Sequence, residues 1–188
     1  MGLRIINPFR FIVSITVLIA VLAFIFLAGL PMIFKSEIEK RAEALPDNEQ
    51  LIGDEKNGTM AVPNTWKAVD VGSDASALQY TDPDGSMVIT LNSSTGKKSY
   101  NINNARASAL RAANDLQESG AVGVTNSTVQ LSETEAVQVY GYYGDTDNAR
   151  VIWLLADEKG ILHYVSADGT LDTVRTAVEM VENSFKFV

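Results

Sequence analysis

An uncharged apolar run from Phe11 to Phe34 constrains this chain more than any other feature of its sequence. As a helix its 24 residues would span about 36 Å, which exceeds the roughly 30 Å hydrocarbon core of a bilayer. A cleaved signal peptide is the alternative, but its apolar part is shorter and precedes small residues at a cleavage site. Here the run leads into Gly29-Leu30-Pro31-Met32. We therefore predict a retained transmembrane helix over residues 11–34, with the lipid bilayer as its partner.

The charges that flank the predicted helix indicate its orientation. Residues 1–10 hold Arg4 and Arg10 and no acid, whereas the bases that follow the helix are interleaved with glutamates. Basic residues favour the cytoplasmic side of a membrane helix. The opening INPFRFIVSITVLIAVLAFIF also resembles the single-pass signal anchors of Gram-positive surface proteins. We expect a cytoplasmic tail over residues 1–10 and a C-terminal domain outside the cell membrane.

Residues 35–60 are expected to connect the membrane helix to the domain. Residues 35–45 are rich in helix formers, so the membrane helix is predicted to continue for two or three turns until Pro46 stops it. Residues 47–59 are polar, contain Gly53 and Asn57-Gly58, and offer little to bury. This stretch predicts a linker, and the domain is then expected over residues 61–188.

From Ala61 onward the sequence consists of short alternating segments separated by turn signals. The predicted strands and helices, in chain order, are strands 66–71, 77–81 and 87–91, helix 102–118, strands 122–131, 136–143, 150–156 and 161–166, and a last helix capped by Thr170. Short connections make the later strands antiparallel neighbours. The order predicts an α+β fold, an antiparallel sheet of about seven strands with helices packed on it.

Several short motifs in this domain match a known family. They are V-P-N-T-W at 62–66, Y-T-D-P-D-G at 80–85, E-A at 135–136, L-H-Y-V at 162–165 and N-S-F-K-F at 183–187. With a helix ahead of a run of antiparallel strands, these motifs resemble the PsbP-like family, which includes bacterial surface proteins of the DcrB and LpqN type. The resemblance implies an αβα sandwich and a role in binding or assembly. It carries over no catalytic residues.

The composition argues against several classes of function. The chain has no cysteine, which excludes a thiolate nucleophile and a zinc site built on cysteine. Its formal charge is −8 and no basic stripe is present, which argues against nucleic acid as a partner. No cofactor motif is found, and none is expected.

One histidine and two acidic turns are the remaining candidates for chemistry. Because no nucleophile or orienting acid lies near His163 in sequence, we predict a sheet residue with satisfied nitrogens. Asp82 and Asp84, or Asp145 and Asp147, could hold a hard cation if folding joined their turns, but aspartate is common in turns for local reasons. We therefore predict no catalytic residue and no metal ligand.

Aromatic residues supply the candidate ligand-binding surface, which consists of Tyr140, Tyr142, Tyr143, Trp153 and Tyr164. Tyr140 and Tyr142 should share one face of a strand and Tyr143 the other, which places much aromatic surface on the sheet. An exposed aromatic groove would suit a peptide, glycan or lipid. The alternative is that the core or a covering helix buries all five.

These features predict a membrane-anchored extracytoplasmic binding or assembly module of the bacterial cell envelope, without catalytic activity. An envelope protein, peptide or glycan is the expected partner. One alternative is an accessory or sensor subunit that acts through its transmembrane helix, where small residues such as Ala20, Ala23 and Gly29 would permit helix packing. A hydrolase that uses clustered carboxylates is the other.

Overall fold

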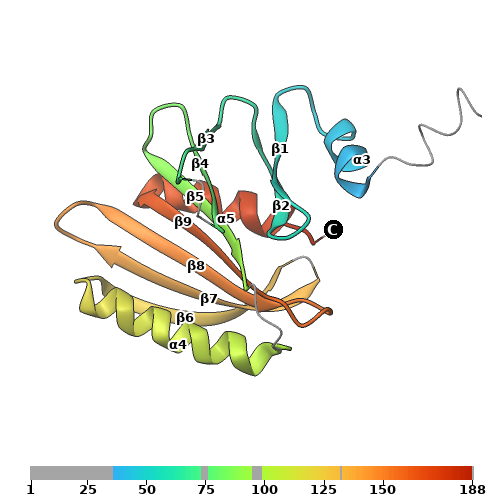
Figure 1. Cartoon of the computed structure of the whole chain (residues 1–188). Coiled ribbons are helices and arrows are strands. Elements are labelled where there is room, and N and C mark those ends of the chain that lie inside the picture. Colours follow the sequence, from blue (N-terminus) through green and yellow to red (C-terminus); the bar gives the residue numbers. More distant parts are fainter. Residues whose placement is uncertain (1–35, 73–75, 95–98, 132, 188) are drawn as a thin grey trace, which may run out of the picture. The chain divides into compact units, whose positions relative to one another are not determined.

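The computed structural model describes residues 36–72, 76–94, 99–131 and 133–187 (Figure 1). The chain divides into two units, Met1–Lys40 and Arg41–Val188. The predicted membrane span, residues 11–34, lies outside the described residues. None of the helices within the described ranges is long and apolar enough to cross a membrane.

Helices and strands of the described residues follow the predicted order, with one hairpin added ahead of it. Their bounds are α3 Glu37–Glu43, β1 Glu49–Asp54, β2 Gly58–Pro63, β3 Lys67–Val69, β4 Leu78–Thr81, β5 Met87–Ser93, α4 Ile102–Glu118, β6 Val122–Leu131, β7 Thr134–Tyr143, β8 Asn148–Ala156, β9 Leu162–Thr170 and α5 Leu171–Ser184. The predicted bounds of α4 and β6 are confirmed residue for residue.

Seven strands form one antiparallel sheet in the order β3-β4-β5-β9-β8-β7-β6. Strand β9 lies in the middle and pairs with β5 on one side and β8 on the other. The predicted α+β class and seven-stranded antiparallel sheet are therefore confirmed. The two long helices begin at polar caps, since Asn101 and Thr170 accept hydrogen bonds from the first-turn backbone of α4 and α5, and of these the sequence predicted Thr170.

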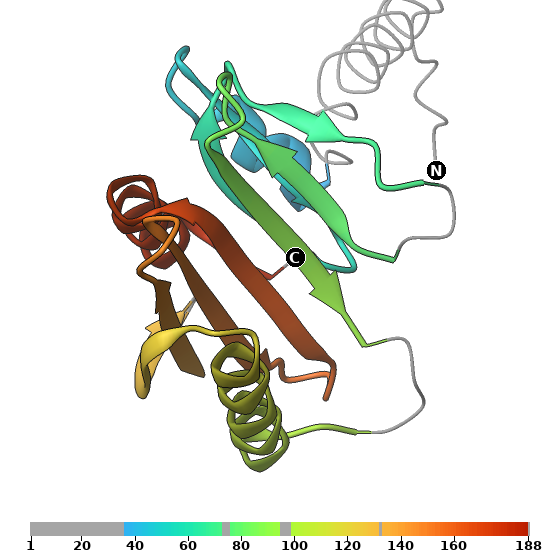
Figure 2. The same cartoon turned by 90° about the vertical axis from the view of Figure 1, so that its left-hand side faces the viewer.

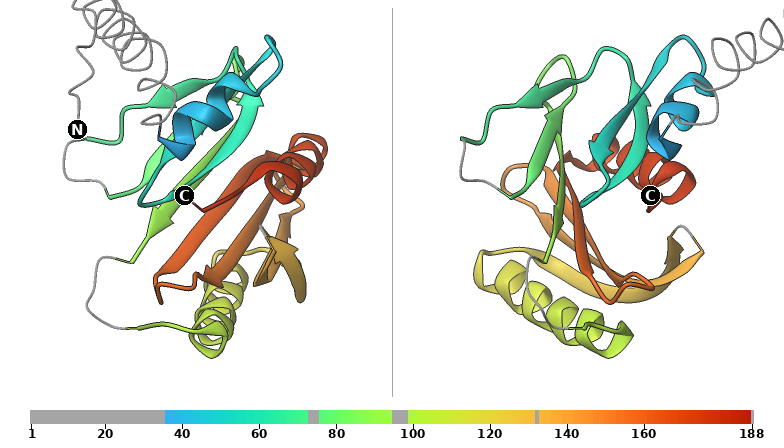
Figure 3. Two further views of the ribbon diagram at one scale, coloured as in Figure 1. Left: turned by 90° about the vertical axis from the view of Figure 1, so that its right-hand side faces the viewer. Right: turned by 45° about the vertical axis from the view of Figure 1, so that its right-hand side comes forward.

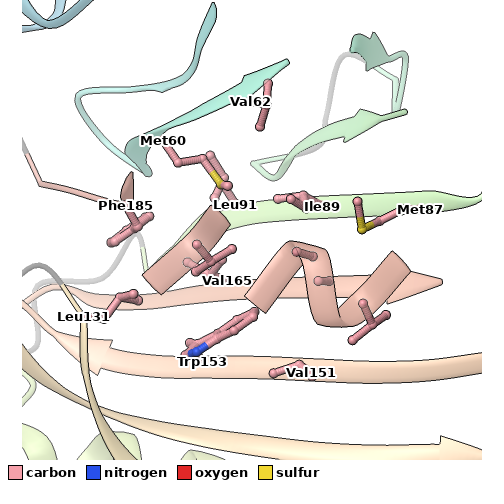
Figure 4. Close-up of a cluster of buried hydrophobic side chains, with 14 of the residues drawn as sticks. Met60, Val62, Met87, Ile89, Leu91, Leu131, Val151, Trp153, Val165 and Phe185 are labelled. Carbon is pink, nitrogen blue, oxygen red and sulfur yellow. The ribbon is translucent and has the colours of Figure 1, made fainter. Parts of the chain in front are cut away.

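One face of the sheet is covered by α5 and by the β1–β2 hairpin. Helix α5 packs on β2, β5, β6, β8 and β9. The core between them contains large, fully buried side chains from the sheet, the hairpin and the end of α5 (Figure 4), among them Met60, Ile89, Leu91, Leu131, Trp153, Val165 and Phe185. This layer is dry and closely packed, and it supplies most of the hydrophobic stabilisation.

The other face is covered by α4, but only in part. Helix α4 packs on β6, β7 and β8. Its small residues Ala105 and Ala109 allow a close approach, and Gly141 lies under its last turn, where an added Cβ would come within 3.2 Å of Leu116. Figures 2 and 3 show α4 along the β6–β8 half of the sheet, while β4 and β5 extend away from it. The sheet therefore lies between two unequal helical layers.

The stretch expected to be a polar linker is instead part of the domain. Strands β1 and β2 form a two-stranded antiparallel hairpin across residues 49–63. The phenol of Tyr80 accepts a hydrogen bond from Gly53 N at 3.2 Å, and Ser184 Oγ accepts one from Ala61 N at 3.0 Å. The polar sequence misled the prediction because residues 47–59 contain only two large apolar side chains, Leu51 and Ile52, and these show no periodic pattern.

Helix α3 also differs from the prediction. We expected it to continue the membrane helix, but Ser36 begins it anew. Ser36 Oγ accepts from Glu39 N at 3.2 Å, and Glu39 Oε2 accepts from Ser36 N at 2.9 Å. This reciprocal pair is a capping box, the arrangement that starts a helix. The helical character predicted for residues 35–45 is confirmed over Glu37–Glu43.

Candidate functional site

The five aromatic residues predicted as a binding surface do not lie on one surface. Tyr140 and Tyr142 pack on the α5 side of the sheet, whereas Tyr143 and Tyr164 pack on the α4 side. Trp153 has no exposed surface and lies within the core under α5. Alternation along β8 turns Trp153 toward the α5 face of the sheet. It is buried there because β8 pairs with a strand on each side and lies under a helix. Trp153 is therefore removed from the candidate surface.

The part of this face that α4 leaves uncovered carries a polar groove, lined from β5 and β9 and from the ends of β7 and β8 near residues 143–150. Two adjoining hollows of about 430 and 420 Å³ share Val88, Arg150 and Asp168 in their linings. We call them together the Arg150 groove. Its further lining residues include Gln79, Ser86, Thr90, Tyr143, Thr146, Asn148, Tyr164 and Ser166.

Strand register explains why these side chains meet. Asp168 on β9 stands opposite Arg150 on β8 and opposite Val88 on β5. Ser166, two residues earlier on β9, stands opposite Thr90 in the same way. Because residues two apart on a strand share a face, the even-numbered residues of β9 all face this side. Three strands thus bring one polar cluster together.

An ion pair forms the centre of the groove. Arg150 donates from Nε to Asp168 Oδ1, and Ser166 Oγ donates to Asp168 Oδ2 at 3.2 Å. The side chains of Arg150 and Asp168 are 43% and 28% exposed. Burial alone would lower the pKa of Arg150, but the hydrogen bond and charge of Asp168 outweigh it and raise that pKa above its ordinary value. Arg150 therefore stays positively charged beside Asp168, and both side chains remain partly open to a ligand.

Two tyrosines flank this pair. Burial raises the pKa of Tyr164, and a hydrogen bond with Ser166 opposes the shift only in part, so its phenol is neutral at physiological pH. The hydroxyl of Tyr143 lies 2.9 Å from Ser119 Oγ, just after the end of α4. The groove therefore has aromatic surface beside its charged centre. The sequence pattern predicted both tyrosines but not Arg150 or Asp168, since one begins a predicted strand and the other follows the end of the next.

A second hollow lies on the α5 face and contains Tyr140. Its volume is about 580 Å³, and Val151, Leu171 and Val174 are among the residues that line it. Its charged lining residues are Arg175 and Glu179 of α5. Arg175 is strongly exposed and pairs with Asp172, its neighbour on the same helix. Solvated charges of this kind fix no ligand, so the larger hollow is the weaker candidate.

His163 lies on the opposite face from the groove and is 2% exposed. Its Nε2 is 3.2 Å from Asp157 Oδ2, while its Nδ1 has no hydrogen-bond partner among the described residues. The prediction of satisfied nitrogens thus holds for one nitrogen. Burial lowers the pKa of His163, and the Asp157 contact offsets part of that shift. Nearby Ser93 donates to Asn57 rather than to the imidazole, so these residues form no nucleophile–base pair.

The two acidic turns serve local structure. The Asp82 carboxylate accepts from Ser86 Oγ at 2.5 Å and from Met87 N at 3.1 Å, which closes the turn before β5. Asp147 accepts from the Tyr142 hydroxyl at 2.9 Å, and this bond raises the pKa of Tyr142. Within the described ranges, no three acidic or histidine side chains lie close enough to hold a metal ion.

A solved structure of a Bacteroides protein supports the fold. No protein-family model matches the chain, and no curated protein matches it significantly. A crystal structure from Bacteroides thetaiotaomicron matches with a TM-score of 0.50 at 16% identity, over 70% of this chain and 45% of that one. LpqN of Mycobacterium tuberculosis, which is involved in cell envelope biogenesis, matches with a TM-score of 0.45 at 15% identity, over 81% of this chain and 98% of that one. The chain spans less than half of the Bacteroides protein, and likeness at such identity concerns the fold alone. Membership of the PsbP-like family remains a prediction.

Proposed function

We propose that this protein is a membrane-anchored binding module of the bacterial cell envelope, with its domain outside the cytoplasm and its ligand in the Arg150 groove. The apolar run over residues 11–34 supports the anchor, and the basic tail before it supports the orientation. PsbP-like motifs in the domain agree with a role in binding or assembly.

The observation that carries the proposal is the Arg150–Asp168 pair in a hollow of the sheet. A partly exposed ion pair adds little to stability, at most about 1 kcal/mol. Further along the same face, β7 and β8 place Val137, Ile152 and Leu154 under α4. If positions 150 and 168 served only packing, we would expect apolar residues there as well. A charged pair held open to solvent is better explained as a site for a polar ligand.

Binding without catalysis suits the chemistry of this groove. The carboxylate of Asp168 already accepts from Arg150 and Ser166, which leaves it a poor general base. The serine hydroxyl donates to that carboxylate, and His163 faces the other side of the sheet. An orienting site with no activated nucleophile holds a ligand and leaves its bonds intact.

Binding is tested with the full-length chain in detergent micelles and washed cell-envelope fragments. We expect the fragments to retain the protein on sedimentation, and Arg150→Gln to reduce the retained fraction severalfold. Arg175→Gln is the matched control, because it removes the same charge from α5 on the other face. Equal retention of all three proteins would contradict a role for the groove.

Topology is tested by cysteine labelling, since the chain has no cysteine of its own. Ser127→Cys places a thiol on the exposed strand β6, and Asn7→Cys places one in the tail ahead of the predicted membrane span. In intact cells a membrane-impermeant maleimide should label the first variant, and the second only after lysis. The reverse pattern would overturn the extracytoplasmic placement.

A further inference from the structure

We infer that the ligand of the Arg150 groove is an uncharged carbohydrate, held through its hydroxyl groups. This inference rests on the proposed binding function and names the chemical class that the groove fits. Its grounds are the charge of the lining, the donors and acceptors it offers, and the mixture of polar and apolar surface.

The charge of the groove argues for a neutral ligand. Among the described residues that line the two hollows, Arg150 and Asp168 are the only arginine, lysine, histidine, aspartate or glutamate, and their charges offset each other. An anionic ligand would have to approach Arg150 beside the like charge of Asp168, in a chain whose formal charge is −8. A cationic ligand would compete with Arg150 for Asp168. An uncharged ligand meets neither cost.

The hydrogen-bonding groups of the groove suit hydroxyls. Arg150 uses Nε for Asp168, which is one of the five N–H donors of a guanidinium. Gln79 and Asn148 each offer a planar amide with both donors and an acceptor, and Thr90 offers a hydroxyl. A sugar hydroxyl both donates and accepts, so a ring with neighbouring hydroxyls can pair with such groups in several places at once. A purely apolar ligand would leave these groups unsatisfied.

The remaining surface suits the C–H faces of a sugar ring. Val88 lies beside the ion pair, and the rings of Tyr143 and Tyr164 supply aromatic area with a hydroxyl at the edge. The two hollows adjoin through Val88, Arg150 and Asp168. Two adjoining hollows of this size match successive sugar units better than a single compact ligand.

The test is direct binding of saccharides to the full-length chain, in a polyoxyethylene detergent so that no sugar headgroup competes. The neutral probes are chitotetraose, maltotetraose and mannotetraose, and the anionic probe is tetragalacturonate. We expect at least one neutral probe to bind by titration calorimetry, with Arg150→Gln weakening it about tenfold or more. Tyr164→Phe, which removes only a hydroxyl, should weaken it severalfold, and Arg175→Gln should leave it unchanged.

The outcomes separate this inference from the function on which it rests. If envelope fragments retain the protein in an Arg150-dependent manner but no neutral probe binds at millimolar concentration, the carbohydrate inference is overturned and the binding function stands. Tighter binding of tetragalacturonate than of every neutral probe would also overturn it. If neither fragments nor saccharides show dependence on Arg150, both proposals fail. Circular dichroism of each variant confirms that it is folded.

Discussion

The two faces of the seven-stranded sheet use the same strands for different purposes. On the α5 face, Val165 and Ala167 of β9 are fully buried in a core that also takes in the β1–β2 hairpin. On the α4 face, Ser166 and Asp168 of the same strand join a polar groove. Alternation along β9 therefore separates the fully covered α5 face, which we call the sealed layer, from the partly open α4 face.

This difference in cover decides on which face of the sheet charged and polar side chains can lie at a low energetic cost. A charged pair under α5 would carry a desolvation penalty in a fully dry core. The same pair beyond the reach of α4 stays partly hydrated. The incomplete cover on the α4 side thus permits a binding groove, while the complete cover on the α5 side stabilises the fold. Four measurements would test this contrast between the two faces.

The largest effect is expected from Trp153→Ala in the sealed layer. Removing a fully buried indole should lower the free energy of unfolding by about 3–5 kcal/mol, through lost burial and a cavity. Urea unfolding followed by circular dichroism measures it. Trp153→Phe is the matched variant and should cost much less, because it also removes an indole N–H that has no partner among the described residues. A cost below 1 kcal/mol for alanine, roughly that of a surface change, would break the contrast.

Met60→Ala tests whether the hairpin belongs to the sealed layer. Met60 is fully buried, so its truncation should lower the free energy of unfolding by about 2–4 kcal/mol. A residue in a linker would show almost no effect. Glu55→Ala, at the exposed turn of the same hairpin, should change stability by less than about 0.5 kcal/mol. Similar small changes for both variants would restore the linker interpretation.

Acidification should destabilise the domain through His163. Burial holds its pKa in the folded state below the ordinary 6.5. The stability that the folded domain gains from a neutral His163 is therefore fully present above pH 6.5. This stability is lost as the pH falls from 6.5 toward the pKa of the folded state, because the unfolded chain binds the proton first. The limiting slope is about 1.4 kcal/mol per pH unit. Unfolding measured between about pH 5.5 and 7.5 should show a stability that is nearly level at the upper end and falls below about pH 6.5 with a slope of at most this limit, and His163→Gln should flatten that fall. An unchanged slope in the variant would assign the effect to other groups.

Arg150→Gln should have the smallest effect on stability, at most about 1 kcal/mol, because its ion pair is partly exposed. Thermal unfolding alongside Arg106→Gln, which removes another exposed pair with Glu135, gives the comparison. A loss of several kcal/mol at Arg150 alone would show that the pair is structural. That result would contradict the proposal that the α4 face is a binding surface.

Much of the fold was predictable because its signals are local. The amphipathic pattern of α4 and the turn signals on either side of β6 gave their bounds, and Asn101 and Thr170 act as caps in the structure. The hairpin at residues 49–63 was missed because Ile52, Met60 and Val62 are its few buried apolar side chains, and distant partners such as Tyr80 and Ser184 complete its contacts. Such long-range hydrogen bonds leave no periodic pattern to detect.

The binding site was predictable only in part. Strand alternation correctly separated Tyr143 from Tyr140 and Tyr142. It did not show that Trp153 is sealed under α5, or that Arg150 on β8 faces Asp168 on β9, since both depend on strand order and helix placement. Arg150 and Asp168 are 18 residues apart in the sequence, and only the strand register shows that they form an ion pair.

The sequence by itself determined the apolar run ahead of the domain, the strand and helix periodicities, and the absence of cysteine chemistry, because each is a property of local composition. Tertiary structure alone decided which face is sealed and which is open. Helix α4 packs on β6, β7 and β8 without covering Arg150 on β8 or the polar residues of β5 and β9, so these are left to meet solvent or a ligand, because helix placement depends on contacts between residues far apart in the sequence.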